Sequence, residues 1–359
     1  MEAYALAEMI VGQRRLGVAA VVVIAAMAGA WLDGAAAKGG RQQSLSPCGS
    51  VLNVATWSPS GNRIAFVGTG FGSSAICVAD AGGRHAKPLR GATCPRRGYC
   101  RLINTPTELY WARPPRLVYG DLAKGIFAVV PGGKPRHVGV SRDTYGAFSV
   151  DAAGDRVAYG SPDGPYSTGP VTVLSVPSGR VVGTIGGTKG DNTSPSLSPD
   201  GKQVAFEGGP SGVSAASATG SRLRPLKQCG GGDPVWSPTG RWIACLGPPR
   251  TWPSGSALLL VTPQGNASIT VVRPSLGVRH IFGWSPNGMR IAFSAQNSDS
   301  RKLDVVNLAT DKVRQLLSPS GEYIAWSPDS RQLLVTNRCT LWRVPVVGTK
   351  KSRRLRSCS

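Results

Sequence analysis

A ten-residue phrase returns seven times along this chain of 359 residues, and it is close to Trp-Ser-Pro-Asp-Gly-x-x-Ile-Ala-Phe. The copies begin at Trp57, Trp111, Val150, Leu197, Trp236, Trp284 and Trp326. Their starts are 54, 39, 47, 39, 48 and 42 residues apart, so the mean period is about 45. A period of this size, with an aromatic residue and a glycine turn in each unit, is the signature of a β-propeller blade.

Each phrase predicts a tight turn followed by a buried strand. In the copy at Leu197, Ser198 suits the first turn position, Pro199 presets φ at the second, Asp200 tolerates the third and Gly201 ends the turn. The run after the turn, such as residues 63–67, is apolar on both faces. This pattern indicates a strand that is packed between two neighbouring blades.

A second pair of short β-rich runs follows each phrase, which gives four strands per blade. Three copies are weaker, namely those at Trp111, Val150 and Leu197, and they leave six or eight blades open as alternatives. The direct count predicts an all-β propeller of seven four-stranded blades over residues 48–358, preceded by an N-terminal signal or anchor helix.

The phrase Trp-Ser-Pro-x-Gly-x-x-Ile-Ala-Phe resembles the TolB-type, WD-like propeller repeats of bacterial envelope proteins, and the resemblance covers roughly residues 48–358. Such repeats occur in binding proteins, in the gating domains of peptidases and in a few lyases. The resemblance therefore implies the fold, but it does not choose among these functions. It is expected to describe a free-standing propeller rather than TolB itself, because only about 16 residues separate the N-terminal apolar run from Cys48.

The N-terminus has the pattern of an export signal. Arg14 and Arg15 precede an uncharged apolar stretch from Leu16 to Leu32, and small residues suited to cleavage follow it. A retained membrane anchor is the alternative, since 17 residues are at the short edge for a membrane span. Residues 1–37 are thus predicted to be a signal peptide or anchor with a short tether, and the propeller is expected outside the cytoplasm, secreted or anchored.

Eight cysteines in an exported chain predict disulfides. Cys339 and Cys358 flank the last hairpin, whose turn is expected at Gly348, and Cys229 and Cys245 bracket the start of the blade at Trp236. Cys94 and Cys100 form the third candidate pair, while Cys48 and Cys77 belong to the first blade. No Cys-x-x-Cys pair is present and the chain has only three His, so neither a metal site nor a cofactor is expected.

No catalytic motif stands out, because the chain lacks a Gly-x-Ser-x-Gly nucleophile elbow. Asp143, Asp191 and Asp233 fall near the predicted entrances of inner strands, and His280 falls just before one. These four residues are candidates for the lining of the central channel. The alternative is that the acids cap loops and the histidine is incidental.

The chain is strongly basic, with 41 Lys and Arg against 19 Asp and Glu and a net charge of +22. A field of this sign attracts polyanions, although a compositional bias toward Arg explains the charge equally well. Nucleic acid is not favoured as the ligand, because basic and aromatic residues do not interleave. The C-terminal run with Lys350, Lys351 and Arg353 is expected near a frayed end and to supply only diffuse attraction.

Two long connections are the predicted binding loops, since rigid blades present their loops for recognition. Residues 92–106 carry one candidate set and residues 248–256 carry the other, and the alternative for both is a solvated loop. The candidate binding residues are Arg96, Arg97, Tyr99, Arg101, Arg250 and Trp252.

Two functions remain open. The first is a non-catalytic, monomeric scaffold that binds a protein or an anionic envelope polymer. The second is a propeller-type enzyme, such as a glycan lyase, with its site at the mouth of the central channel.

Overall fold

The computed structural model of the chain describes residue 48 and the ranges 50–70, 73–93, 109–112, 116–121, 125–130, 132–139, 148–160, 169–186, 193–208, 212–248, 256–297, 300–317, 323–337 and 340–357. Residues 45–359 form one compact unit, and every described residue belongs to it. Within these ranges no helix has the length and hydropathy needed to cross a membrane. The predicted signal or anchor segment, residues 1–37, lies outside the described residues.

The described part contains seven four-stranded antiparallel sheets, each built from strands that are consecutive in the chain. Blade 1 holds β1 (Ser50–Trp57), β2 (Arg63–Gly70), β3 (Ser73–Asp80) and β4 (Lys87–Thr93). Blade 2 holds β5 (Leu109–Ala112), β6 (Arg116–Asp121), β7 (Gly125–Val129) and β8 (Arg136–Gly139). Blade 3 holds β9 (Phe148–Val150), β10 (Arg156–Tyr159), β11 (Val171–Ser175) and β12 (Val181–Ile185). Blade 4 holds β13 (Thr193–Leu197), β14 (Gln203–Glu207), β15 (Val213–Ser217) and β16 (Arg224–Pro225).

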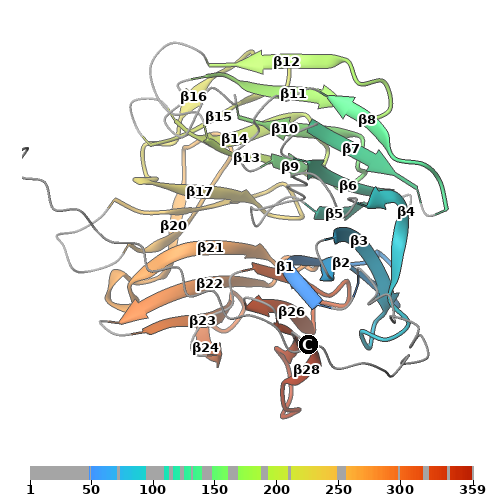
Figure 1. Cartoon of the computed structure of the whole chain (residues 1–359). Helices are drawn as coiled ribbons and strands as arrows, with labels where there is room; N and C mark the ends of the chain where they lie inside the picture. The colour runs from blue at the N-terminus through green and yellow to red at the C-terminus, as the bar shows by residue number, and fades with distance from the viewer. Residues whose placement is uncertain are drawn as a thin grey trace, which may run out of the picture. The chain divides into compact units, whose positions relative to one another are not determined.

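The remaining three blades follow the same plan. Blade 5 holds β17 (Gly231–Trp236), β18 (Ile243–Leu246), β19 (Leu258–Val261) and β20 (Ser268–Val272), and the short 3-10 helix η1 (Pro274–Leu276) follows it. Blade 6 holds β21 (Val278–Trp284), β22 (Arg290–Asn297), β23 (Ser300–Asn307) and β24 (Lys312–Leu317). Blade 7 holds β25 (Tyr323–Trp326), β26 (Gln332–Asn337), β27 (Thr340–Pro345) and β28 (Arg353–Arg356). The predicted seven-bladed, all-β propeller is therefore confirmed (Figure 1).

The repeated phrase forms the turn between the first two strands of a blade, as its sequence predicts. The opening serine accepts a hydrogen bond from the backbone five residues on, at 3.0 Å from Arg63 N to Ser58 Oγ. The fourth turn position lies in the left-handed region, with φ of 72° at Gly61. In the weak copy at Val150, the carboxylate of Asp151 replaces the serine and accepts from Arg156 N at 3.1 Å. A degenerate copy thus keeps the turn because another acceptor occupies the same place.

The core lies between the blades rather than inside any one of them. Ile64, Ala65, Phe66 and Val67 are all fully buried. Ile64 and Phe66 pack toward blade 7, whereas Ala65 and Val67 pack toward blade 2. Seven hydrophobic clusters of this kind join each blade to the next. Because inner strands such as β2 are buried on both faces, a blade needs its neighbours stacked beside it to be stable.

The phrase tryptophans add a specific contact at the inner edge of the blades. The first strands of neighbouring blades contact one another, which places these strands around the centre. Trp284 donates a hydrogen bond from Nε1 to Val235 O at 3.0 Å, and Trp326 donates one to Gly283 O at 3.2 Å. Each of these indoles therefore bonds to the first strand of the preceding blade.

The seam between blade 7 and blade 1 closes the ring without a shared strand. β1 contacts β25 and β26, and the blue and red segments meet in Figure 1. Arg356 of β28 donates from its two terminal nitrogens to Cys48 O and, at 2.9 Å, to Gly83 O. Its guanidinium carbon also lies 5.1 Å from the centre of the Phe66 ring. One arginine thus holds the last strand to the backbone of the first blade at two points.

Two disulfides lie in the described part of the chain. Cys229–Cys245 joins the segment before β17 to β18, as the sequence predicts. Cys48–Cys77 ties the residue before β1 to β3, a pairing that the sequence left open. The candidate pairs Cys94–Cys100 and Cys339–Cys358 lie outside the described residues.

Candidate functional site

The hairpin of β27 and β28 forms one wall of a pocket. Its tip turns at Gly348, whose φ is 80°, as the sequence predicts. Arg314 of β24 donates from Nη1 to Val346 O at 2.9 Å and to Gly348 O at 3.3 Å. Val346 N in turn donates to Arg331 O at 2.9 Å. The tip is therefore held both by blade 6 and by the turn that precedes β26.

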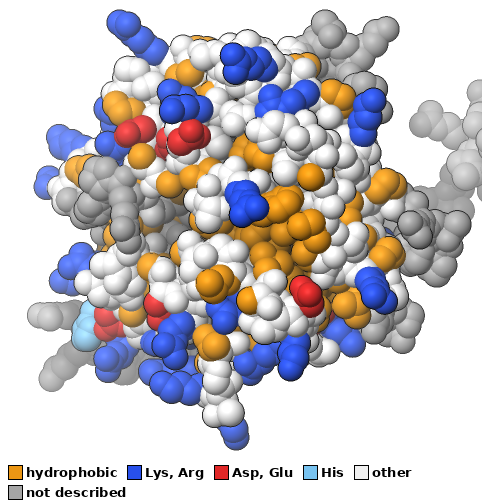
Figure 2. All heavy atoms as spheres, turned by 180° about the vertical axis from the view of Figure 1, so that it is seen from behind, with side chains coloured by type: hydrophobic (Ala, Val, Ile, Leu, Met, Phe, Trp, Pro, Cys, Tyr) orange, Lys and Arg blue, Asp and Glu red, His pale blue; other side chains and the backbone are white. Residues whose placement is uncertain are grey.

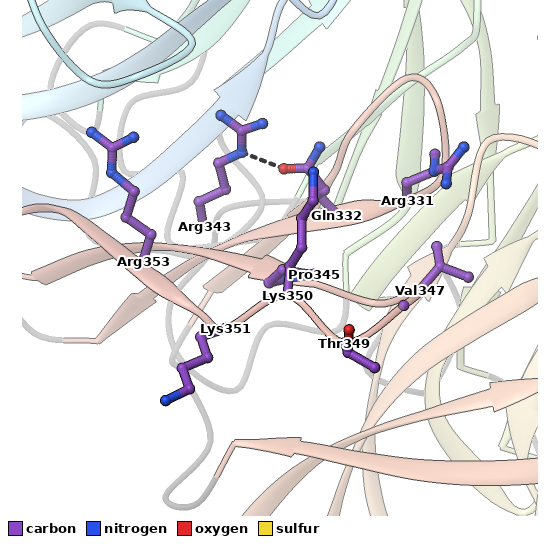
Figure 3. Close-up of a pocket in the computed structure, with 10 residues that line it drawn as sticks. Arg331, Gln332, Arg343, Pro345, Val347, Thr349, Lys350, Lys351 and Arg353 are labelled. Carbon is purple, nitrogen blue, oxygen red and sulfur yellow. Dashed lines mark hydrogen bonds between the residues drawn. The ribbon is translucent and has the colours of Figure 1, made fainter.

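A pocket of about 490 Å³ lies between this hairpin and the start of β26. Figure 3 shows its lining side chains, which come from β26, β27, β28 and the connecting turns. The lining residues are Arg331, Gln332, Arg343, Pro345, Val347, Gly348, Thr349, Lys350, Lys351 and Arg353. Its volume falls in the range of about 300–1,000 Å³ that is typical of small-ligand sites.

Five of the ten lining side chains are cationic and none is acidic. In the described ranges the ion pairs join Asp80, Asp155 and Asp200 to other basic residues, and none of them includes a cation of the pocket. The pocket thus carries five positive charges that no carboxylate neutralises through an ion pair. Four of these side chains are exposed, so solvent and salt screen much of their mutual repulsion, whereas Arg343 is half-buried and is screened less.

Arg343 is the pocket cation with two described side-chain contacts. Its Nε donates a hydrogen bond to Gln332 Oε1, which leaves the two terminal nitrogens outside that bond (Figure 3). Its guanidinium carbon lies 6.0 Å from the centre of the Trp57 ring across the seam with blade 1. A guanidinium that is held at Nε and faces an aromatic ring is pre-organised, so it loses less entropy when it binds an anion.

Arg343 and Arg353 are directly opposite each other in the β27–β28 register. Like charges in this position destabilise a pair of strands. Proteins break such rules of local stability chiefly at functional or strained sites and compensate elsewhere, as the contacts of Arg343 with Gln332 and Trp57 do here. The arrangement therefore points to an anionic ligand that binds between Arg343 and Arg353 and offsets their repulsion.

The charge of the chain as a whole does not locate this site. In the view of Figure 2, Lys and Arg side chains are spread around the edge of the molecule, and hydrophobic side chains gather toward the middle. Elsewhere, Arg116 pairs with Asp155 at 3.3 Å and Arg84 with Asp80 at 3.6 Å. The blade 7 pocket is distinguished by the number of cations and the lack of acids in its lining, not by net charge.

Two carboxyl groups with raised pKa values lie away from the pocket. Burial raises the pKa of Asp304, which is 5% exposed in β23. Burial also raises the pKa of Asp151, although hydrogen bonds from the backbone of Arg156 and Asp155 oppose the shift. The carboxylate of Asp151 accepts the backbone hydrogen bonds that form its turn. Among the described residues, the carboxylate of Asp304 accepts no hydrogen bond that would give it a similar role.

Few of the site residues suggested by the sequence can be placed. Arg96, Arg97, Tyr99, Arg101, Arg250, Trp252, Asp143 and Asp191 lie outside the described residues. Asp233 belongs to β17. His280 lies within β21 rather than just before it, because the bulged strand begins at Val278, and its ring is 4.8 Å from the ring of Phe282. β17 and β21 are adjacent first strands, so Asp233 and His280 belong to neighbouring inner strands.

The sequence reasoning missed the pocket, and one expectation about it was wrong. Lys350, Lys351 and Arg353 do not lie at a frayed end, because Arg353 begins a strand that pairs with β27 and the tip is bonded to blade 6. The sequence feature that indicates this pocket is the run of basic residues from 350 to 356, which follows a glycine turn. Arg331 and Arg343 could not be added to it before the register of the last blade was known.

No protein-family model matches the chain, and no curated protein matches it significantly. Solved structures do match. An oligogalacturonate lyase in complex with manganese aligns with a TM-score of 0.66 at 14% identity, over 83% of this chain and 90% of that one. The oligogalacturonate lyase of Vibrio parahaemolyticus aligns with a TM-score of 0.64 at 13% identity, over 85% of this chain and 93% of that one. A chain of a mitotic checkpoint complex gives a TM-score of 0.59 at 16% identity, over 90% of this chain and 99% of that one.

TolB from Acinetobacter baumannii is also among the similar structures, at a TM-score of 0.48 and 15% identity over 80% of each chain. The predicted resemblance to TolB-like and WD-like propellers is confirmed as a resemblance of fold. At these identities the likeness shows the fold alone, so the chemistry of the site must be argued from its own residues.

Proposed function

We propose that this protein is a non-catalytic scaffold outside the cytoplasm, which binds an anionic envelope component through the pocket of blade 7. The observation that carries the proposal is that five cations, and no acid, line one pocket. A protein partner would bind at the same place through an acidic segment.

The geometry of the pocket supports binding rather than catalysis. Arg and Lys stay charged at neutral pH and hold anions by charge-assisted hydrogen bonds, but neither is suited to proton transfer without a strongly shifted pKa. The lining contains no His, Asp, Glu or Cys that could act as an acid, base or nucleophile. The pocket can therefore retain and orient an anion.

The proposed location outside the cytoplasm rests on the disulfides and on the apolar stretch near the N-terminus. Disulfides persist in oxidising compartments outside the cytoplasm, and two are present among the described residues. The apolar stretch from Leu16 to Leu32 has the pattern of a secretory signal or an anchor. Both features favour a propeller that faces the cell envelope or the medium.

A lyase-type enzyme is the second candidate. The solved structures with TM-scores of 0.66 and 0.64 are named oligogalacturonate lyases, and such an enzyme would place its site at the channel mouth. Asp233 and His280, on adjacent first strands, would then be its catalytic candidates, together with Asp143 and Asp191. Among the described residues, no group of three or more His, Cys, Asp or Glu could hold a metal ion.

Fluorescence anisotropy tests the scaffold proposal directly. The full chain is titrated into fluorescently labelled polyphosphate and labelled polygalacturonate. We expect binding to at least one polymer, weakened about tenfold by the double substitution Arg343→Gln with Arg353→Gln, since about 1.4 kcal/mol corresponds to a factor of ten. The matched control is Lys87→Gln with Arg90→Gln, which removes two exposed charges from β4. Equal losses from both double variants would reject the pocket as the site.

The enzyme candidate needs a separate assay. The chain is incubated with oligogalacturonate, with and without Mn²⁺, and the ultraviolet absorbance of an unsaturated product is followed. The scaffold proposal predicts no product. Product that disappears in a His280→Ala variant would establish the enzyme instead.

A further inference from the structure

The pocket of blade 7 has far more room than a single ion needs. Its volume of about 490 Å³ equals the space of about 16 water molecules at about 30 Å³ each. The cations also come from several elements, since Arg331 precedes β26, Arg343 is on β27, and Lys350 and Lys351 are on the hairpin tip. Arg343, Arg353 and Lys350 extend to the same side of the hairpin (Figure 3). A small monovalent anion could contact only part of this set.

The five positive charges of the pocket favour an anion that carries several negative charges in a small volume. A carboxylate carries one negative charge, so two carboxylates would leave three of the five cations unneutralised. A phosphomonoester carries about −1.5 to −2 near neutral pH and offers three strong acceptor oxygens. Two such groups supply about three or four negative charges in the same space. The opposed arginines, Arg343 and Arg353, also provide planar forks that match phosphate oxygens.

Resting on the proposed function, we infer that the natural ligand of the blade 7 pocket carries phosphomonoester groups, in clusters of two or more. The Arg343–Arg353 pair binds one group, and Lys350, which extends to the same side of the hairpin, contacts the next (Figure 3). A sugar bisphosphate and a lipid phosphate headgroup share this chemistry.

The ionisation of the ligand gives this inference a signature in pH. A phosphomonoester has its second pKa near 6, so its doubly ionised fraction rises about tenfold between about pH 5 and about pH 7. Uronate carboxylates are already ionised across most of that range. The pocket lining contains no His, Asp or Glu. A rise in affinity over this interval therefore reports on the ligand and not on the pocket.

Isothermal titration calorimetry on the full chain compares fructose bisphosphate with digalacturonate, two sugars that each carry two anionic groups. We expect fructose bisphosphate to bind more tightly near neutral pH, and to weaken about tenfold toward about pH 5 for each phosphate that must be doubly ionised. The Arg343→Gln, Arg353→Gln variant should lose most of this affinity, and the Lys87→Gln, Arg90→Gln control should keep it. Equal or tighter binding of digalacturonate, or an affinity for the bisphosphate that is flat with pH, would overturn the inference.

Vesicles distinguish the two sources of the same chemistry. Phosphatidate presents a phosphomonoester, whereas phosphatidylglycerol at equal surface charge presents only a diester. Binding that prefers phosphatidate assigns the ligand to a lipid headgroup, and binding of the soluble bisphosphate alone assigns it to a sugar phosphate; both results support the inference. Equal binding to both vesicles, with none to the bisphosphate, contradicts it. If uronate polymers bind at the pocket while phosphomonoesters do not, the scaffold proposal survives and the phosphomonoester inference fails.

Discussion

The seam between the first and last blades should depend on one arginine. Replacing Arg356 by Met keeps most of its apolar stem but removes the two hydrogen bonds to Cys48 O and Gly83 O. Hydrogen bonds to charged groups contribute about 1.5–3 kcal/mol each, or about 3–6 kcal/mol for two. Burial opposes this gain, because desolvation of the guanidinium lowers the pKa of Arg356. We therefore expect a net loss of about 2–4 kcal/mol in the free energy of unfolding.

The assay is thermal unfolding followed by circular dichroism under oxidising conditions. For a domain of this size the loss corresponds to a fall in Tm of about 3–6 °C. Arg354→Met is the matched control, since Arg354 lies in the same strand and carries the same charge but is exposed. If Arg356→Met and Arg354→Met lower Tm equally, the ring does not depend on this contact and the account of the seam is wrong.

Three further predictions follow from named contacts. Asp304→Asn should raise Tm at neutral pH, because burial penalises the ionised carboxylate and so raises the pKa of Asp304 above its usual 3.8. The gain in Tm should shrink as the pH of the melt falls through this raised pKa, and it should be absent below about 3.8, where the carboxyl is protonated in both the folded and the unfolded chain. Gly183→Ala should cost about 1–3 kcal/mol in a urea titration, since its new Cβ would lie 2.4 Å from Ala218 O of blade 4, and an unchanged midpoint would show that the two blades separate without strain. Cys339 should pair with Cys358, because the register in which Leu341 pairs with Arg356, continued by two residues, sets the two cysteines opposite each other. Non-reducing peptide mapping that finds either cysteine free or bonded to another cysteine refutes the pairing. Removal of the bridge should lower the free energy of unfolding by about 3 kcal/mol.

The fold could be predicted from the sequence because the residues that define each turn and the strand after it lie within ten consecutive positions. In four of the seven copies a serine and a glycine three residues apart define the turn, and the run after them is apolar on both faces. These rules act over ten residues, so they are visible without knowledge of the rest of the chain. Even the copy with Asp151 in place of serine makes the expected turn, since a carboxylate can accept the same bonds.

The pocket could not be predicted in the same way because its members become neighbours only through pairing. Arg343 and Arg353 are opposed by the register of β27 with β28, and Trp57 reaches Arg343 only because the ring closes. The bridge from Cys48 to Cys77 depends on the same three-dimensional information, whereas Cys229 and Cys245 flank one short strand and were foreseen. Local patterns thus specify the blades, and the contacts between strands and blades specify the site.

The central claim is that blade 7 holds the binding site, and two matched triple variants test it most directly. Each variant removes three positive charges: Arg96, Arg97 and Arg101 from the candidate loop in the first, and Lys350, Lys351 and Arg353 from the pocket in the second, all replaced by Gln. The measurement is the affinity for labelled polyphosphate as a function of salt. The account predicts a larger loss of affinity, and a shallower dependence on salt, for the pocket variant, since fewer counterions are released when fewer charges are neutralised. A larger loss from the loop variant would move the site to residues 92–106 and contradict the account.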